Sequence, residues 1–300
     1  MCRSDPHWPD SFDCLGILNM NIDLHIHTTA SDGSLTPTQV VQEAQQAGLG
    51  VISVADHDTT SGIAEALEAQ DASDVIVVPG VEISASHPSG EAHILGYWMD
   101  HDDPAFQAFL ERPRSTRGPR IIEMCKCLRG LGLEVQAEEV FEEAGGKEAV
   151  GRPHLAKVLL AKGYVKDMEE AFQGYLIKGA PAYVKRIKNS TAETIAAIHR
   201  FGGISVIAHP GLLNDPGLVD SLIQEGAMGI EVLCHEHDSA AEERYSEMAD
   251  RNGLLKTGGS DYHGDMLEKS FRLGDLQVPY PFYLEMKEAK AHIQSPTRDR

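Results

Sequence analysis

The chain has little cysteine and no long apolar run. Its 300 residues include 5 cysteines, a scattered set without the second pair that a zinc knuckle would need beside Cys125 and Cys127. Sparse cysteines favour a reducing cytoplasm, and residues 1–19 lack the basic start and apolar core of a secretory signal. No apolar run approaches the roughly 18 residues that a membrane span needs. We therefore expect a cytoplasmic protein without disulfides or membrane contact.

Basic residues are also scarce: 26 Lys and Arg face 46 Asp and Glu, for a net charge of −20. Binding along a long nucleic acid depends on a basic surface that neutralises phosphates, so this balance argues against a protein that coats DNA or RNA. A small anionic substrate is not excluded. It would need local positive charge, which a bound metal or a short basic segment can supply.

One short basic segment stands out against this acidic background. Six basic residues fall within the 18 positions from 112 to 129: Arg112, Arg114, Arg117, Arg120, Lys126 and Arg129. Three of these arginines are spaced by three, which would align them on one helix face. Pro113 and Pro119, however, favour a loop before Ile121. The segment is therefore either a phosphate-binding surface or a solvated basic face.

The first apolar segment of the chain carries two histidines. In residues 21–27 apolar and polar side chains alternate, which predicts a strand with His25 and His27 on one face, about 7 Å apart along it. Asp32 and Gly33 follow in a loop. Two neutral imidazoles at such a place can share a divalent metal. By itself this pattern fits a polar strand face near water equally well.

Other short apolar runs end in, or carry near one end, a histidine or a carboxylate. They are Val51 to Ala55 before Asp56-His57-Asp58, Val75 to Val81 before Glu82, Ala92 to Tyr97 with His93, Ile204 to Ala208 before His209-Pro210, and Leu254 to Ser260 before Asp261-Tyr262-His263. A single such residue would be hydrogen-bonded in a core or solvated. Their recurrence has a common explanation in a parallel α/β architecture, in which functional groups gather at one end of the strands.

Helical patterns separate these strands. Thr36, Pro37 and Gln39 form a helix-start signal, and helices are expected over 191–200 and 239–252, the second ended by Gly253. Alternating strands and helices predict βα units in a parallel sheet, and seven units would make a closed or nearly closed barrel.

The expected domain organisation interrupts this barrel once. Residues 105–185 contain helical patterns and almost no strand signal, and we expect them to form an inserted helical cap over the metal end. The barrel would comprise 20–104 and 186–290. Residues 1–19 are expected to be a disordered extension, and 291–300 a C-terminal tail.

The ordered motifs resemble those of the PHP (polymerase and histidinol phosphatase) family of metal-dependent phosphoesterases, from about residue 21 to about residue 264. They are His25-x-His27, Asp32-Gly33, Asp56-His57-Asp58, Glu82, His93, His209-Pro210 and Ser260-Asp261-x-His263. The insert, with Gly151-Arg152-Pro153-His154, resembles the subgroup that acts on nucleoside monophosphates, 3′,5′-bisphosphorylated nucleotides and the 5′ ends of short RNA. The resemblance implies a distorted (β/α)7 barrel, similar to a TIM barrel, with two or three divalent metal ions.

The resemblance also implies ligands for each ion. One would be bound by His25, His27, Glu82 and Asp261, a second by Glu82, His93 and His209, and a third by Asp32, His57 and His263. Some relatives have a histidine in place of Asp32. Mixed imidazole and carboxylate ligands suit Mn²⁺, Zn²⁺ or Fe²⁺, and the sequence does not choose among them.

The expected reaction is attack on phosphorus by a metal-bridged hydroxide, with Glu82 and Asp261 in catalytic positions. The substrate would be a small phosphorylated molecule, a nucleotide or short oligonucleotide. Guanidinium groups match phosphate oxygens, so Arg117, Arg120 and Arg152 are expected to hold it. Candidates for substrate contact or for protonation of the leaving group are His154 and His237, with His235 competing for that role.

Other functions remain open. Within phosphoesterases, the chain could be a histidinol phosphatase or a polymerase-type exonuclease, although no polymerase is attached. An amide- or lactone-cleaving metallohydrolase also begins with His-x-His; there a carboxylated lysine would bridge the metals, and Lys185 is the tempting candidate. A non-catalytic metal-binding module is a further class, but such modules often lose ligands, and none of the motif is missing.

Overall fold

The structure, a computed structural model, describes residues 20–147, 150–185, 187–213, 215–264 and 272–293. The expected extension over 1–19 and all but the start of the expected tail lie outside the described residues. The chain divides into two compact units. Unit 1 comprises Met1–Phe109 and Asn189–Arg300, and unit 2 comprises Leu110–Lys188. No helix in the described part of the chain has the length and apolarity that crossing a membrane requires.

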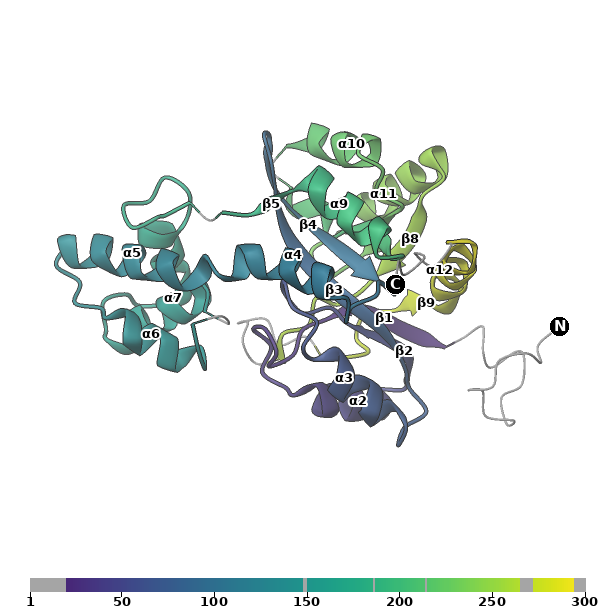
Figure 1. The fold of residues 1–300 in the computed structure, drawn as a ribbon, viewed down its shortest axis with the longest axis horizontal. Coiled ribbons are helices and arrows are strands. Elements are labelled where there is room, and N and C mark those ends of the chain that lie inside the picture. Colours follow the sequence, from purple (N-terminus) through teal and green to yellow (C-terminus); the bar gives the residue numbers. More distant parts are fainter. Residues whose placement is uncertain (1–19, 148–149, 186, 214, 265–271, 294–300) are drawn as a thin grey trace. The chain divides into compact units, whose positions relative to one another are not determined.

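A curved sheet forms the centre of unit 1 (Figure 1). In the described residues its strands are β1 (Asn21–Ile26), β2 (Leu49–Val54), β3 (Ile76–His87), β4 (Gly90–Tyr97), β5 (Asn189–Ser190), β6 (Ile204–Ile207), β7 (Gly229–Leu233), β8 (Leu255–Gly258) and β9 (Val278–Pro279). Their order is β8-β7-β6-β4-β3-β2-β1-β9, with β5 beside β3. The sheet nearly closes, because Ile26 bridges to Tyr262 just after β8 and the His27 amide donates to the Tyr262 carbonyl at 2.9 Å. The expected α/β barrel of distorted TIM type is confirmed.

Strand β4 departs from the expected parallel pattern. It pairs antiparallel with both β3 and β6. The residues between β3 and β4 are too few for a crossover helix, so the two strands form a hairpin rather than a βα unit. Because β4 runs backwards, His93 near its start lies opposite Ser84 in the second half of β3. A histidine from the beginning of a strand thus reaches the edge where parallel strands end.

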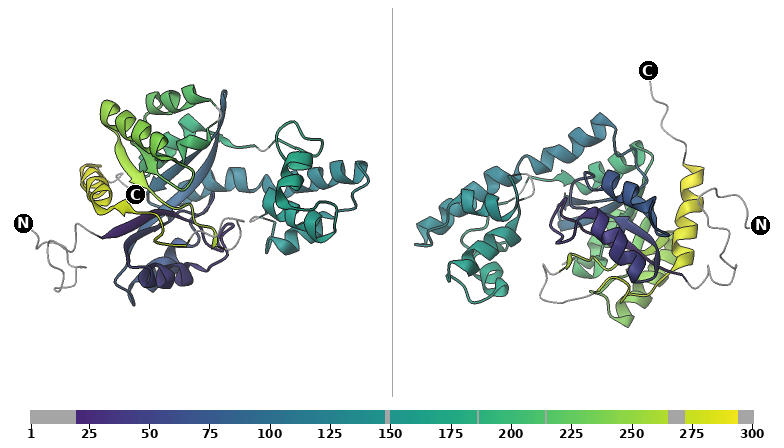
Figure 2. Two further views of the ribbon diagram at one scale, coloured as in Figure 1. Left: turned by 180° about the vertical axis from the view of Figure 1, so that it is seen from behind. Right: turned by 90° about the horizontal axis from the view of Figure 1, so that it is seen from below.

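Unit 1 also contains the helices α2 (Pro37–Gln46), α3 (Ile63–Gln70), the start of α4 (Pro104–Arg114), α9 (Thr191–Arg200), α10 (Pro216–Gln224), α11 (Ser239–Asn252) and α12 (Tyr280–His292), which follows the last strand (Figure 2). The Thr36 hydroxyl accepts from the Gln39 amide at 3.2 Å, and the Gln39 side chain accepts from the Thr36 amide at 2.9 Å. Gly253 ends α11 at a φ of 64°, a left-handed conformation that glycine adopts without strain. The expected helices over 191–200 and 239–252 are confirmed.

Unit 2 is helical and has its own apolar core. It contains α5 (Arg117–Gly130), α6 (Ala137–Glu143), α7 (Arg152–Ala161) and α8 (Met168–Ala171), which continues into a π-helical turn (Phe172–Leu176). Ile121, Leu128 and Leu155 are buried in this core. The expected loop before Ile121 is wrong, because α5 begins at Arg117 and Pro119 lies in its first turn, where backbone amides have no helical acceptor.

Candidate metal centre

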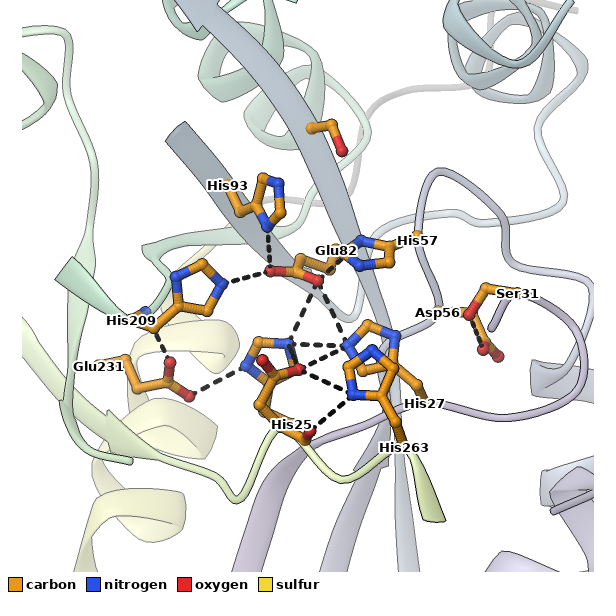
Figure 3. A network of polar contacts seen from close by, with 12 residues as sticks. His25, His27, Ser31, Asp56, His57, Glu82, His93, His209, Glu231 and His263 are labelled. Carbon is orange, nitrogen blue, oxygen red and sulfur yellow. Dashed lines mark hydrogen bonds and ion pairs between the residues drawn. The ribbon is translucent and has the colours of Figure 1, made fainter. Parts of the chain in front are cut away.

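All nine expected ligands belong to unit 1, and most of them gather in three overlapping groups (Figure 3). The groups are His25, His27, Glu82 and Asp261; His27, Asp32, His57 and His263; and His57, Glu82 and His93. Within each group the potential ligand atoms all lie within 4.8 Å of one another. His209, the ninth, places its Nε2 atom 2.9 Å from Glu82 Oε1. Segments more than 200 residues apart in sequence thus meet at one end of the barrel.

The two histidines of the first strand converge. His25 in β1 and His27 directly after β1 are fully buried, and their Nε2 atoms lie 3.2 Å apart. Both nitrogens lie near Glu82 Oε2, at 3.4 and 3.3 Å. Asp261 Oδ1 lies 3.4 Å from the His25 nitrogen and 2.9 Å from the His27 nitrogen. Two imidazoles and two carboxylates therefore enclose one position that a cation could occupy.

Glu82 lies at the middle of the cluster, within β3 rather than at its end as the sequence indicated. It reaches the end of the barrel because β3 extends beyond β2, where the Glu82 carbonyl accepts from the Asp58 amide at 2.8 Å. Its Oε1 atom faces His93 Nδ1 at 2.8 Å and His209 Nε2 at 2.9 Å. The other oxygen, Oε2, faces His25, His27 and His57. Each oxygen thus serves a different set of imidazoles, as a bridging carboxylate would.

The group around Asp32 is more open. The Asp32 carboxylate lies 3.8 Å from His27 Nδ1, 3.8 Å from His57 Nε2 and 3.5 Å from His263 Nε2. The Asp32 and His57 side chains are 23% and 18% exposed, whereas Glu82 is fully buried. His27 faces this group with Nδ1 and the Glu82 group with Nε2, so it adjoins both positions.

Charge separation at the centre is strong. Burial alone would raise the pKa of Glu82. The charges of the surrounding histidines, of which His57 contributes most, outweigh burial and hold this pKa well below its usual range. Burial lowers the pKa of His27, but its close contacts with Asp261 and Glu82 outweigh this and raise it to about 10. For His93 burial prevails, and its pKa falls to about 4. The carboxylates are therefore ionised, and protons and metal ions compete for the imidazoles around them.

The residues fit divalent metal ions. Glu82 Oε2, Asp261 Oδ1 and Asp32 Oδ1 are buried and accept no hydrogen bond from the described residues, although imidazole nitrogens lie close to them. A buried, ionised oxygen without a donor costs free energy that a bound cation offsets. Imidazole nitrogens with carboxylate oxygens form the ligand set that borderline divalent metals favour.

Further carboxylates orient the segments that carry the ligands. Asp56 accepts from the Thr28 amide at 2.8 Å and from the Ser31 hydroxyl at 2.6 Å, which fixes the loop before Asp32. Asp23 Oδ1 accepts from the His25 amide at 3.2 Å and from the Ser260 amide at 2.9 Å. The sequence placed Asp56 beside a ligand but gave no sign of its partners.

Glu231 is a residue that the sequence analysis missed. It is fully buried in β7 and contacts His25 and the backbone of His209. The available signal was a glutamate inside the apolar run Gly229–Leu233, a segment that was not among the expected strands.

The expected substrate residues have partners close by. In unit 1, His237 Nδ1 donates to the Val232 carbonyl at 2.8 Å, and Nε2 accepts from the Gly211 amide at 3.0 Å. A proton transfer by His237 would therefore require one of these bonds to open.

The other four expected substrate residues, Arg117, Arg120, Arg152 and His154, belong to unit 2. Arg120 Nε donates to the Val184 carbonyl at 2.7 Å, and Arg152 Nη1 donates to the Leu176 carbonyl at 3.3 Å. His154 Nδ1 accepts from the Gly151 amide at 3.0 Å at the start of α7. These contacts stabilise unit 2, and the roles of the four residues toward substrate stay predictions.

Comparisons with known proteins agree with this geometry. The PHP domain profile matches residues 23–164. A 3′,5′-nucleoside bisphosphate phosphatase of Chromobacterium violaceum is 36% identical over 81% of this chain and 87% of its own. A 5′-3′ exoribonuclease of Haemophilus influenzae is 34% identical over 86% of this chain and 96% of its own.

Two solved structures are similar over most of the chain. One, from Bifidobacterium adolescentis, is provisionally assigned as a metal-dependent phosphoesterase; it has a TM-score of 0.80 and 30% identity, covering 89% of this chain and 95% of its own. The other, from Chromobacterium violaceum, is described as an amidohydrolase with bound sulfate and no metal; it has a TM-score of 0.79 and 34% identity, covering 93% of this chain and 99% of its own. Extended similarity to these proteins and the ligand cluster lead to one conclusion: the chain belongs to the PHP family of metal-dependent phosphoesterases.

Proposed function

We propose that this protein hydrolyses phosphate monoesters of nucleotides, either nucleoside monophosphates or 3′,5′-bisphosphates, or acts on the 5′ ends of short RNA. The observation that carries the proposal is the position of Glu82, whose two oxygens face different imidazoles of one cluster. Relatives named as a bisphosphate phosphatase and an exoribonuclease support a small phosphorylated substrate. We further propose a cytoplasmic location, which the free cysteines Cys125, Cys127 and Cys234 support.

Three sets of side chains are proposed to bind two or three Mn²⁺, Zn²⁺ or Fe²⁺ ions. The first is His25, His27, Glu82 and Asp261, the second Glu82, His93 and His209, and the third Asp32, His57 and His263. When bound, such ions would lower the pKa of a water and neutralise charge on phosphate oxygens. The protein's part is to keep Glu82 and Asp261 ionised and to aim the imidazoles at them.

Recognition of the rest of the substrate is proposed for the arginines of unit 2. Arg117, Arg120 and Arg152 would bind a second phosphate or a nucleotide's distal group, because a guanidinium can pair with two phosphate oxygens. The protein's net charge of −20 makes a local basic group important for any anionic ligand. His154 and His237 are proposed to contact the substrate or the leaving group.

Cleavage of amides or lactones is the second candidate, favoured by the similar structure that is described as an amidohydrolase. Against it, a glutamate, Glu82, lies among the imidazoles where a carboxylated lysine would have to bridge. A turnover screen of metal-reconstituted protein should therefore include phosphate esters, amides and lactones.

The expected outcome is hydrolysis of nucleotide phosphate esters by protein that holds more than one metal ion per chain. Turnover of amides or lactones without phosphatase activity would overturn the proposed function. Well-folded, metal-replete protein that holds no ion at these residues would overturn the metal centre itself.

A further inference from the structure

Glu231 contacts two of the proposed ligands from the side opposite Glu82 (Figure 3). Its Oε1 atom lies 3.2 Å from His25 Nδ1, and its Oε2 atom accepts from the His209 backbone amide at 2.7 Å. It does not appear in any of the three groups of potential ligands found among the described residues. Glu231, His25, Glu82 and His209 thus form a closed ring of contacts, in which Glu231 is the member that belongs to none of the proposed ligand sets.

The contact with His25 determines which ring nitrogen is available. An ionised carboxylate only accepts hydrogen bonds, so the imidazole that faces it must carry its proton on Nδ1. The other nitrogen, Nε2, is then the one that can exchange its proton for a metal ion; it lies 3.4 Å from both Glu82 Oε2 and Asp261 Oδ1. Pairing of a ligand imidazole with a carboxylate in this way fixes the ring and raises its basicity.

The contact with His209 acts on the backbone. His209 has a φ of 26° and a ψ of 60°, in the left-handed region that residues other than glycine rarely adopt. Such a conformation persists only where surrounding contacts enforce it. The bond from its amide to Glu231 is one such contact, and in this conformation the ring places Nε2 2.9 Å from Glu82 Oε1.

We propose that Glu231 is a positioning residue of the metal centre. It holds the tautomer of His25 and the backbone of His209 together, so that two side chains from distant segments meet the two oxygens of Glu82. This inference rests on the proposed function only in taking His25 and His209 as metal ligands.

The substitution that tests it is Glu231→Gln, which keeps the size of the side chain. An amide has one oxygen and one NH₂ group. If the NH₂ group faces His25, Nδ1 must accept and the proton moves to Nε2, which can then no longer bind a metal. If the NH₂ group faces His209, it meets the backbone N–H, and that bond is lost.

A matched control lies on the neighbouring strand. Thr257 of β8 pairs in register with Glu231, is fully buried, and its hydroxyl has no hydrogen-bond partner among the described residues. Thr257→Val therefore alters a buried side chain beside Glu231 without removing a hydrogen bond among the described residues.

The measurement is titration of metal-free protein with Zn²⁺ by calorimetry, with circular dichroism to verify folding. Glu231→Gln should bind Zn²⁺ about 10- to 100-fold more weakly than wild type, as for other carboxylates that orient metal-bound histidines, while Thr257→Val should bind normally. Wild-type affinity in Glu231→Gln, or an equal loss in Thr257→Val, would overturn the proposal.

A second measurement needs no substitution, in case Glu231→Gln fails to fold. In Zn²⁺-loaded wild-type protein with ¹⁵N-labelled histidine, the resonances of His25 should show a proton on Nδ1 and a metal-bound Nε2. A proton on Nε2 would contradict the proposal. Neither measurement depends on phosphatase activity. Absence of nucleotide hydrolysis would therefore count against the proposed function, whereas the Zn²⁺ titration and the histidine resonances would still decide this inference.

Discussion

The two units use their charged side chains differently. In unit 1, the oxygens of Glu82 and Asp261 are buried among imidazoles and include atoms without a hydrogen-bond donor in the described residues. In unit 2, Arg120 and Arg152 donate to backbone carbonyls, and their guanidinium groups lie over the rings of Tyr183 and Phe172. The first arrangement has a physical need for a cation. In the second, the guanidinium groups already have partners within the protein, and a ligand would have to share them or displace them.

The strongest test of this difference is Glu82→Gln. A neutral amide is a poor bridge between cations, so we expect lower metal content and a loss in kcat of roughly 10³-fold, or about 4 kcal/mol. Elemental analysis and turnover of a nucleotide substrate measure the two effects.

Glu68→Gln, at an exposed position of α3, is the matched control and should behave as wild type. Near-normal turnover with full metal occupancy in Glu82→Gln would show that the bridge has been placed wrongly.

A core substitution in unit 2 should separate the units. Leu155 of α7 is fully buried, and Leu155→Ala should lower the free energy of unfolding by about 2–5 kcal/mol. Because every proposed ligand belongs to unit 1, the metal content of the folded protein should stay unchanged. Leu160→Ala, on the same helix but 38% exposed, should have little effect on either quantity. Loss of metal from folded Leu155→Ala would mean that unit 2 is needed to maintain the centre.

The arginines give a smaller effect. Arg117→Ala, Arg120→Ala or Arg152→Ala should leave metal binding intact and lower kcat/KM for nucleotides by about 10- to 100-fold, the loss of a charge-assisted contact worth about 1.5–3 kcal/mol. A minimal ester such as p-nitrophenyl phosphate, which has no distal group, should be affected less.

Arg129→Ala is the matched control for these variants, because Arg129 also donates to a backbone carbonyl of unit 2, that of Val135 at 2.8 Å. If Arg117→Ala, Arg120→Ala and Arg152→Ala all kept wild-type kcat/KM on nucleotides, these three arginines would not take part in substrate binding.

A last test concerns the effect of pH on metal binding. The pKa of His27 is raised to about 10 and that of His209 to about 9, so both imidazoles are in the protonated, positively charged form at pH 7 in the metal-free protein. A metal must displace these protons, so affinity should rise with pH below these values, roughly tenfold per pH unit for each proton released. Calorimetry in buffers of different ionisation enthalpy measures the number of protons that are released when the metal binds. Affinity that is independent of pH would show that these imidazoles are not ligands.

Sequence periodicity and order predicted much of this site. Alternation in residues 21–27 placed His25 and His27 on one face, and strand-end motifs brought distant residues such as His57 and Asp261 to the same end of the barrel. These features depend on local geometry and on the common direction of parallel strands. They are therefore visible in a single sequence.

The remaining features depend on pairing and on tertiary contacts. Nothing in the short apolar run around His93 reveals that its strand runs antiparallel, and the extension of β3 past Glu82 depends on β4 and β5 beside it. Glu231 has the same spacing as any polar residue in a strand, and only folding brings it to His25. The hydrogen bond from Arg120 to the Val184 carbonyl could not be predicted from the sequence, because 64 residues separate the two and only folding brings them together.

Sharing of side chains between groups has a consequence for how the protein responds to metal supply. Glu82, His27 and His57 each belong to more than one group of potential ligands. An ion bound in one group would immobilise side chains that the next group needs, which favours further binding, but it would also repel a second cation. Successive binding constants are therefore linked, and occupancy would follow a coupled isotherm rather than the sum of independent sites. The metal concentration at which the sites fill is accordingly a property of the whole cluster. A substitution in one group of ligands would shift that concentration for the other groups as well.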